Sequence, residues 1–257
     1  MQLRFRFLIA AFLLFTGACQ AATPPAEADK PGDRIPAQQG DVLVYPVEHA
    51  SFVLTWNGKT IYVDPVGGAK KYAQLPKPDA VLVTHGHFDH FDLPTLTALI
   101  GPDSKARIVA PKSVAAKLTA SLSKRTTVLA AEANTEVDAI QIEAVPAYNI
   151  TSERTKFHPK GEGLGYVIQL GGKRIYAAGD TEDTPEMRKL KNIDAAFLPM
   201  NLPYTMDVQQ AADAVRQFKP KIVYPYHYRN ADKSMADLDE FKRLVGEGVE
   251  VRVLKWY

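Results

Sequence analysis

The residues most able to do chemistry lie in one short segment, Thr84-His85-Gly86-His87-Phe88-Asp89-His90, which holds three of the six histidines of the chain. Imidazole and carboxylate groups bind zinc and similar ions, and a protein interior tolerates such polarity when it is coordinated. A loop that is rich in histidine by chance is the alternative, but the close spacing favours a metal site. Its ligands would be His85, His87, Asp89 and His90.

The elements on either side of this cluster must position it. Ala80-Val81-Leu82-Val83 is typical of a short buried strand, and Asp92-Leu93-Pro94 predicts the start of a helix that continues to Ile100. Side chains two residues apart on an extended segment project to the same side. His85 and His87 are therefore expected to face the same point at the end of a strand.

Two later strand ends carry ligand-type side chains in the same way. The apolar residues 175–178 lead into Asp180, and the apolar residues 222–224 lead into His227. Taken alone, an aspartate that follows a glycine is more typical of an ordinary turn. Beside the first cluster, both side chains become candidate ligands of the same metal centre.

Turn signals and apolar spacing predict the rest of the fold. Asn57-Gly58 and Gly171-Gly172 each indicate a β-hairpin, and Asn57-Gly58 is a strong signal for a type I′ turn. The hairpins lead to Asp64 and to Asp180, which indicates two similar halves that face one another. The expected later helices cover residues 111–122, 185–190, a stretch from 205 onward, and 234–246, the last opened by a Ser-x-x-Asp capping box.

The run His-Gly-His-Phe-Asp-His at residues 85–90 resembles the H-x-H-x-D-H signature of the metallo-β-lactamase fold superfamily, a set of metal-dependent hydrolases. The resemblance implies an α+β fold, a four-layer αββα sandwich in a single domain. It also implies that Asp180 bridges two metal ions and that His227 binds the second ion. The implied cofactor is zinc, as one or two ions, although Mn²⁺ and Fe²⁺ accept the same ligands.

The chain departs from the common pattern of this superfamily at one place. Many members carry a further histidine, which completes the ligands of the first metal, after the strand that corresponds to residues 139–145. Here Pro146-Ala147-Tyr148-Asn149 follows that strand. The place could be filled by the side-chain oxygen of Asn149, by His158 from the next loop, or by a water molecule.

A narrower resemblance is to the branch that includes ascorbate-6-phosphate lactonase-like proteins and N-acyl-phosphatidylethanolamine phospholipase D. His49 stands where that branch has Gly-His-Ser, and Ala178-Gly179-Asp180-Thr181 and Gly163-Leu164-Gly165-Tyr166-Val167 are also similar. His49 is thus expected near the metal or the substrate; the alternative is a half-buried strand histidine with a hydrogen-bond partner. Asp64 is expected to hold an imidazole N–H rather than to bind metal.

A metal ion with an open position supplies hydroxide at neutral pH, because it lowers the pKa of its bound water to about 7. This hydroxide would attack a carbonyl or phosphoryl centre. Asp89 is the candidate for orienting the water and taking its proton. Tyr148 and Tyr204 lie near ligand-bearing turns and could assist the leaving group.

The loop at residues 150–163 is long and polar, and loops of this length often carry function. It could act as a lid that brings His158 to the metal as a catalytic group, or it could offer cations to an anionic substrate. A solvated surface loop is the alternative. Its basic side chains are Arg154, Lys156 and Lys160.

The N-terminal segment predicts export. Residues 1–22 combine basic residues, an apolar core and small residues, as a signal peptide does, and Thr-Gly-Ala-Cys19 resembles a bacterial lipobox. Residues 23–40 hold four prolines without hydrophobic periodicity and are typical of a flexible tether. Residues 41–257 have the size of one domain. We therefore expect a periplasmic protein, either freely secreted or tethered to the membrane by a lipid on Cys19.

Composition excludes several classes of function. Loss of Arg4 and Arg6 with the signal peptide would lower the formal net charge from +2 to 0, which argues against nucleic acid as a partner. Cys19 is the only cysteine. A lipid on its sulfur would leave no thiol for a disulfide framework or for cysteine catalysis.

Together these features predict a metal-dependent hydrolase that acts on a small molecule, either a lactone, an ester or amide, or a phosphodiester. The absent third histidine and the His49 segment favour the lactonase and phosphodiesterase-like branch over antibiotic hydrolysis. A non-catalytic metal-binding or ligand-binding module on the same fold is the main alternative. A surface-tethered interaction protein with a closed, structural metal is a third.

Overall fold

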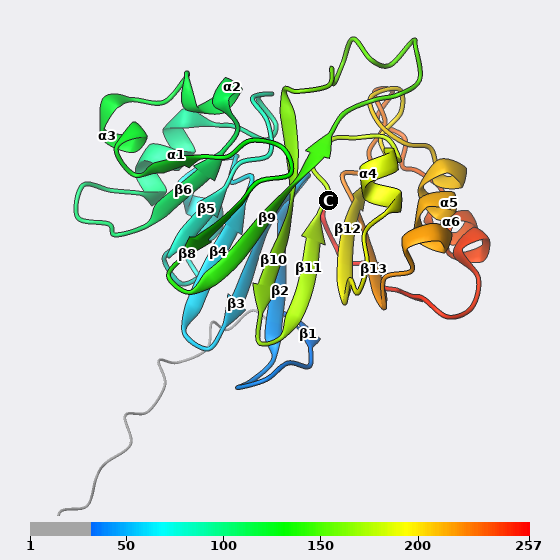
Figure 1. Cartoon of the computed structure of the whole chain (residues 1–257), viewed down its shortest axis with the longest axis horizontal. Helices are drawn as coiled ribbons and strands as arrows, with labels where there is room; N and C mark the ends of the chain where they lie inside the picture. The colour runs from blue at the N-terminus through cyan, green and yellow to red at the C-terminus, as the bar shows by residue number, and fades with distance from the viewer. Residues whose placement is uncertain (1–31) are drawn as a thin grey trace, which may run out of the picture.

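Two seven-stranded β-sheets, packed face to face, form the centre of the computed structural model, which describes residues 32–257 (Figure 1). Helices lie on the outer face of each sheet, so the predicted α+β fold, a four-layer αββα sandwich, is confirmed. The predicted signal peptide, Cys19 and the first part of the tether lie outside the described residues. Within residues 32–257, none of the helices has the length and apolar character that crossing a bilayer requires.

The first sheet contains the N-terminal half of the chain. Its first four strands are antiparallel, and its remaining strands join in parallel. Asn57 and Gly58 both have positive φ, as the predicted type I′ turn requires. The strands, in spatial order, are β1 (Asp33–Ile35), β2 (Val42–Glu48), β3 (Ser51–Trp56), β4 (Lys59–Val63), β5 (Ala80–Leu82), β6 (Arg107–Ala110) and β7 (Thr126–Val128).

The second sheet repeats this plan with the C-terminal half. Its first four strands are again antiparallel and the rest are parallel. Gly171 and Gly172 form its type I′ turn. The strands are β8 (Asn134–Val137), β9 (Ile140–Ala147), β10 (Gly163–Leu170), β11 (Lys173–Ala177), β12 (Ala195–Pro199), β13 (Ile222–Tyr226) and β14 (Glu250–Val251).

Each sheet is covered by the helices of its own half of the chain (Figure 1). On the first sheet, Leu96, Val114 and Leu122 pack on Val81 and Ile108 in one apolar cluster. The helices of the first half are α1 (Leu93–Leu99), α2 (Lys112–Ala115) and α3 (Ala120–Ser123), with a 3-10 helix at Ala69–Tyr72. Those of the second half are α4 (Pro185–Arg188), α5 (Val208–Phe218) and α6 (Leu238–Val245).

Two predicted helices differ from the observed ones. The helix predicted over residues 111–122 is divided into α2 and α3, because Thr119 is extended and caps α3. The last helix begins after Asp237 and not at Ser234. Asp237 supplies the N-cap, whereas the Ser234 hydroxyl donates to Asp232 at 2.6 Å. Ser234 therefore belongs to the preceding turn.

The domain begins earlier than the predicted boundary at Asp41. Residues 33–35 form β1 and pair with β2, so the prediction of a flexible tether up to Gly40 is wrong for this part. Ile35 is buried, and Asp33 accepts hydrogen bonds from Tyr224 at 2.6 Å and from Arg252 at 2.9 Å. These contacts are made with residues far along the chain, which local polarity could not indicate.

Stacked aromatic rings join the two sheets. Phe52 of β3 lies on Phe197 of β12 with ring centroids 4.1 Å apart, and both side chains are fully buried. Near the histidine cluster, the Tyr166 hydroxyl of β10 donates to the Val83 carbonyl at 2.8 Å. The relative position of the two halves is therefore set by tight packing and by a buried hydrogen bond.

Truncating Phe52 to alanine is expected to lower the free energy of unfolding by about 3–5 kcal/mol, since it removes a large buried ring and leaves a cavity between the sheets. Urea denaturation measures this difference. Val128→Ala, at a side chain that is 53% exposed, is the control and should change stability by less than about 0.5 kcal/mol. Equal effects of the two substitutions would contradict the role given to the Phe52–Phe197 stack.

Candidate metal centre

The ligand-type side chains converge at one edge of the sandwich, where parallel strands of both sheets end. The segment after β5 carries the histidine cluster, the segment after β11 carries Asp180, and the segment after β13 carries His227. In α/β sheets, ligands bind beyond the carboxyl ends of parallel strands. The predicted meeting point therefore exists.

Three groups of side chains could each hold an ion, and two of them share His85. Within each group, the ligand atoms all lie within 4.8 Å of one another. The groups are His85, His87 and His158; His49, Asp89 and His227; and His85, His90 and Asp180. The first and third groups share His85, and Asp180 Oδ2 of the third lies 3.5 Å from His227 Nε2 of the second, so two ions could lie side by side.

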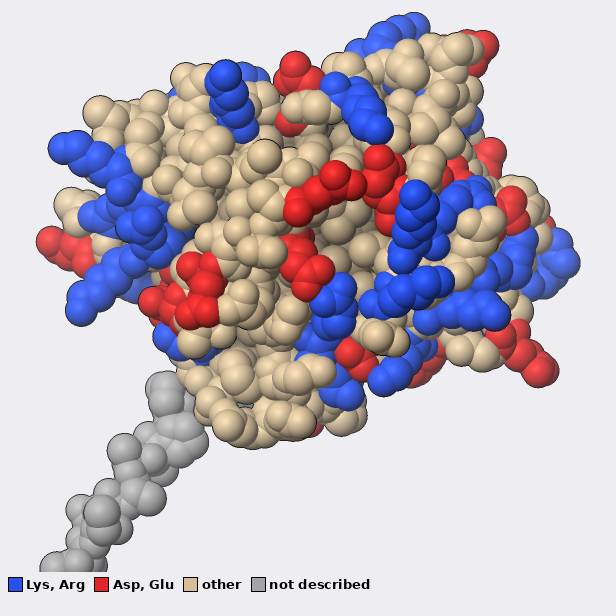
Figure 2. All heavy atoms as spheres, viewed as in Figure 1, with Lys and Arg blue, Asp and Glu red and all other residues tan. Residues whose placement is uncertain are grey.

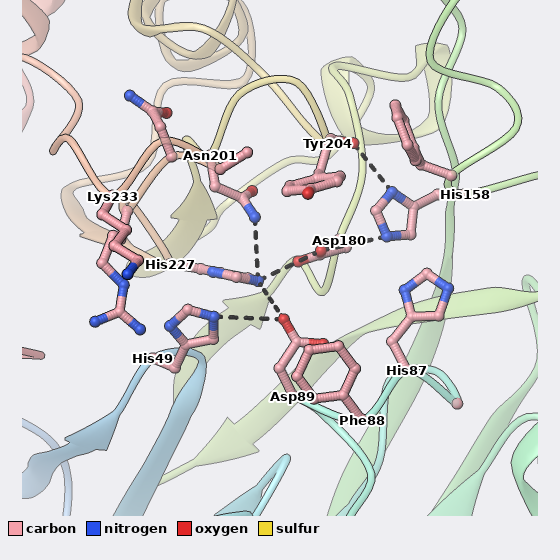
Figure 3. Close-up of a pocket in the computed structure, with 15 residues that line it drawn as sticks. His49, His87, Phe88, Asp89, His158, Asp180, Asn201, Tyr204, His227 and Lys233 are labelled. Carbon is pink, nitrogen blue, oxygen red and sulfur yellow. Dashed lines mark hydrogen bonds and ion pairs between the residues drawn. The ribbon is translucent and has the colours of Figure 1, made fainter.

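Of the alternatives considered for the absent third histidine, His158 is the one that lies in a group with His85 and His87. Its Nε2 is 3.3 Å from Asp180 Oδ2, and its Nδ1 is 3.1 Å from the carbonyl oxygen of Tyr204 (Figure 3). The carbonyl can accept only from an N–H, so Nδ1 carries the proton and Nε2 is free to bind an ion. Asn149, another predicted occupant, lies behind the ring and donates its amide to the carbonyl oxygens of Tyr204 and Arg154.

Several buried ligand atoms have no hydrogen-bond partner among the described residues. They include His90 Nε2, His158 Nε2 and Asp180 Oδ1. Although the two nitrogens lie 3.2 and 3.3 Å from Asp180 oxygens, neither makes a well-oriented hydrogen bond. Leaving buried polar atoms unpaired is costly, and a divalent cation would satisfy all three. The residues present therefore fit a metal ion.

The charge states of His85, His87, His49 and Asp180 suit metal binding. His90 and His227, in contrast, must release a proton to bind an ion, because burial opposes their protonation but Asp180 outweighs it and raises their pKa values. Burial lowers the pKa of His85 well below its usual value, and it also lowers the pKa values of His87 and His49, so these imidazoles are neutral. Burial opposes ionisation of Asp180, but the neighbouring His227 and His90 outweigh it and hold the pKa of its carboxyl well below the usual range. Neutral imidazoles and an ionised carboxylate are the forms that bind zinc.

Asp64 lies behind His90, the position expected for a residue that holds an imidazole N–H. Its Oδ2 is 2.7 Å from His90 Nδ1, and its Oδ1 accepts the Thr84 backbone N–H at 2.7 Å. Asp64 is fully buried and does not face the centre. It orients the ring so that the other nitrogen faces Asp180.

His49 lies beside the histidine that follows β13. Its Nε2 is 3.4 Å from Asp89 Oδ2, and its ring centroid is 4.1 Å from that of His227. The other ring nitrogen is 3.0 Å from the Tyr257 hydroxyl. Figure 3 shows the Asp89 carboxylate beside both rings, with a dashed line to a nitrogen of each. His49 is therefore placed as a member of the cluster and not only as a strand histidine.

A cavity of about 790 Å³ opens over the cluster. His87, Asp89 and Asp180 form the part of its lining that belongs to the cluster (Figure 3). Phe88 and Tyr204 form part of its wall, and the Phe88 side chain is 88% exposed. The cavity thus combines reactive polar groups with an apolar wall, as small-molecule sites commonly do.

The structure does not support the predicted role of Tyr148 with the leaving group. Its hydroxyl donates to Glu186 at 2.9 Å, and the residue does not line the cavity. Instead its backbone N–H and carbonyl both bond the Thr181 hydroxyl, next to Asp180. Tyr204 does line the cavity and orients His158 through its carbonyl.

Sequence reasoning missed other cavity residues. The Asn201 Nδ2 atom lies 3.3 Å from His227 Nε2. Asn201 follows β12, just as the predicted ligands follow their strands. A search for polar side chains directly after apolar strands could have identified Asn201. Arg229, Lys233 and Tyr257 gave no signal, because they reach the site from segments without a recognisable motif.

The chain matches the family model described as "Beta-lactamase superfamily domain" over residues 43–227. A protein named UPF0173 metal-dependent hydrolase from Thermococcus onnurineus is 37% identical, over 80% of this chain and 93% of that protein. A relative of the same family name from Cupriavidus necator is 30% identical, over 96% of this chain and 94% of its own length.

Solved structures agree with these matches. A crystal structure of a protein from Parabacteroides distasonis has 39% sequence identity and a TM-score of 0.76, and the match covers 86% of this chain and 97% of that one. Igni18, a metallo hydrolase from Ignicoccus hospitalis, has 25% identity and a TM-score of 0.69, over 83% and 95% of the two chains. The chain therefore belongs to the beta-lactamase superfamily and, within it, to the UPF0173 metal-dependent hydrolases.

Proposed function

We propose that this protein hydrolyses a lactone, an ester or amide, or a phosphodiester bond in a small anionic molecule, with zinc as one or two ions. The observation that carries the proposal is the unpaired Nε2 of His158, which completes a three-histidine group at the base of an open cavity. The relatives' name, metal-dependent hydrolase, supports the same class of reaction.

The chain offers separate ligands for two ions. His85, His87 and His158 would hold the first. His90 and His227, with Asp89, would hold the second, and Asp180 would lie between the two ions, since its oxygens are 3.2–3.5 Å from His90, His158 and His227. A bound ion supplies a water with a pKa near 7. His158 thus acts as a ligand in this proposal, and not as the catalytic base.

Asp89 is the residue proposed to orient the attacking water. Its Oδ2 lies 3.4 Å from Nε2 of both His49 and His227, so the carboxylate is held at the cavity wall. Burial opposes its ionisation, but hydrogen bonds with the two imidazoles hold its pKa well below the usual range. The group therefore stays ionised and accepts a hydrogen bond in the direction of the cluster.

The non-catalytic alternative loses its main support. That hypothesis depended on an incomplete first ligand set, and the proximity of His158 to His85 and His87 supports a complete one. The exposed cavity above the cluster also disfavours a closed, purely structural metal, because structural sites leave no open position.

The basic side chains at the cavity support an anionic substrate. Arg229 and Lys233 both line it, and neither forms an ion pair with a carboxylate of the described residues. Two of the predicted cations of the 150–163 loop serve a different purpose, because Arg154 pairs with Glu182 and Lys160 pairs with Glu186. The third, Lys156, lines a smaller pocket beside His87 and His158 and is a further cation near the cluster.

The surface charge supports a small molecule over a polyanion. On the face that Figure 2 shows, Lys and Arg gather toward the left and the lower right with Asp and Glu among them, and the formal net charge of the full chain is only +2. Nucleic-acid sites present clustered basic residues along a face or groove. Beside the two cations, the exposed Phe88 ring would suit an apolar part of the substrate.

Removing the metal is expected to abolish hydrolysis, and zinc should restore it. His87→Ala removes one ligand and should lower activity on a panel of lactones, phosphodiesters and acyl amides by more than about 100-fold, since even outer partners of ligands cost 10- to 100-fold. Lys112→Met, at an exposed side chain in the same half, is the control. Full activity of His87→Ala, or a purified protein without stoichiometric metal, would rule out the assigned site.

Arg229→Met is expected to raise KM for an anionic substrate by about 10-fold or more, because a charge-assisted hydrogen bond contributes about 1.5–3 kcal/mol. A neutral analogue with the same reacting bond should keep its KM. Lys242→Met removes an exposed cation on α6, outside the cavity, and is the matched control. Similar changes for the neutral and the anionic compound would argue against charge recognition.

We also propose that the protein is exported and is anchored in the membrane by a lipid on Cys19, with a freely secreted form as the alternative. The supporting feature is the signal-like segment at residues 1–22 with its Thr-Gly-Ala-Cys sequence. Fractionation should place the full chain with the membrane and Cys19→Ala elsewhere. Recovery of both from the cytoplasm would refute export.

A further inference from the structure

Glu182 is a buried carboxylate close to the metal centre that the proposed reaction does not use. It follows Asp180 by two residues, and its side chain is fully buried. It accepts the backbone N–H groups of Ile150 and Thr151 at 2.7 and 2.6 Å and the Thr151 hydroxyl at 2.8 Å. One carboxylate therefore fastens the start of the 150–163 loop to the segment that carries Asp180.

Arg154 extends these connections to a third segment. Its Nη1 donates to Glu182 Oε1 at 2.8 Å and to the Thr205 carbonyl at 2.9 Å. Thr205 follows Tyr204, whose own carbonyl accepts from His158 Nδ1. The ion pair thus joins the loop to the residue that orients the His158 ring.

His158 depends on these connections more than the other proposed ligands do. The histidine cluster, Asp180 and His227 follow β-strands directly, whereas His158 is reached through the long loop. The loop is closed where the Asn149 N–H donates to the His158 carbonyl at 2.8 Å. A ligand must be held within about 0.5 Å of its binding position by the residues around it. Loosening the loop would therefore affect this ligand first.

We propose that the Glu182–Arg154 pair is the positioning device for His158 and sets the affinity of the first metal position. The inference rests on the proposed function, because it takes His158 as a ligand. A purely structural pair would stabilise the fold without acting on one metal position. Metal affinity, measured without substrate, separates these two roles.

Glu182→Gln keeps the shape of the side chain and removes its charge. Titration of the full chain with Zn²⁺ against a chromophoric chelator should show two bound ions in the wild type. In the variant, we expect one ion to bind about 10- to 100-fold more weakly and the other to be unchanged. Trypsin should also cut the variant faster after Arg154 or Lys156, because the loop is less firmly held.

Glu186→Gln is the matched control, since it removes another ion pair of the same loop, with Lys160, at a more exposed position. Zinc affinity should not change in this variant. His158→Ala should weaken the same ion, and adding Glu182→Gln to His158→Ala should cause no further loss. This lack of additivity is what action through His158 requires.

Wild-type zinc affinity in a folded Glu182→Gln variant would overturn the inference, as would fully additive losses in the double variant. If Glu182→Gln does not fold, Arg154→Met removes the nitrogen that donates to Glu182 and to the Thr205 carbonyl. That variant should also weaken one ion only, and unchanged affinity for both ions would again overturn the inference. A wild-type protein that binds no zinc would instead refute the proposed function itself.

Discussion

The buried carboxylate of Asp180 is the constraint on which the arrangement of this protein depends. It lies within 3.2–3.5 Å of imidazole nitrogens of His90, His158 and His227, and it is almost fully buried. A charge in this environment is stable only when opposite charges or metal ions compensate it. The chain must therefore bring three separate segments to one point, and the two-sheet architecture does so by ending strands of both halves there.

The two halves have the same plan but use it differently. In each, a hairpin strand ends just before an aspartate: Asp64 follows β4 in the first half and Asp180 follows soon after β11 in the second. Asp64 lies behind His90 and orients it, whereas Asp180 faces the ligand atoms. Equivalent positions of a repeated fold thus supply an orienting group in one half and a central ligand-type group in the other.

What the sequence could predict depended on how local the signal was. Asn57-Gly58 specifies its turn by the φ angles of two residues, and the spacing of His85 and His87 indicates their common direction within one strand end. Both predictions agree with the structure. The strand at residues 33–35 escaped notice because it is short and mostly polar; it pairs with the nearby β2, and its Asp33 side chain bonds Tyr224 and Arg252, almost two hundred residues or more away.

The same limit explains the metal centre. The six ligand-type residues that follow strands were recognisable, because each comes directly after an apolar run. His158 was only one of three alternatives for the third ligand of the first metal. The sequence of residues 150–163 does not indicate which other segments hold that loop in place. Its position depends on Glu182, whose buried contacts with the loop are made across about thirty residues of sequence. Arg229 and Lys233 likewise reach the cavity from a segment without a local signature.

Because some proposed ligands follow strands and His158 lies on a loop, the stability of the domain and its metal affinity depend on different contacts. The strand-borne ligands are held by the same core that holds the sheets together, including the Phe52–Phe197 stack, so loosening them requires loosening the domain. His158 is held by a polar network over a loop, and such networks can change without disrupting a hydrophobic core. The proposed affinity of the first metal position therefore depends on residues, Glu182 and Arg154, that are not among its proposed ligands.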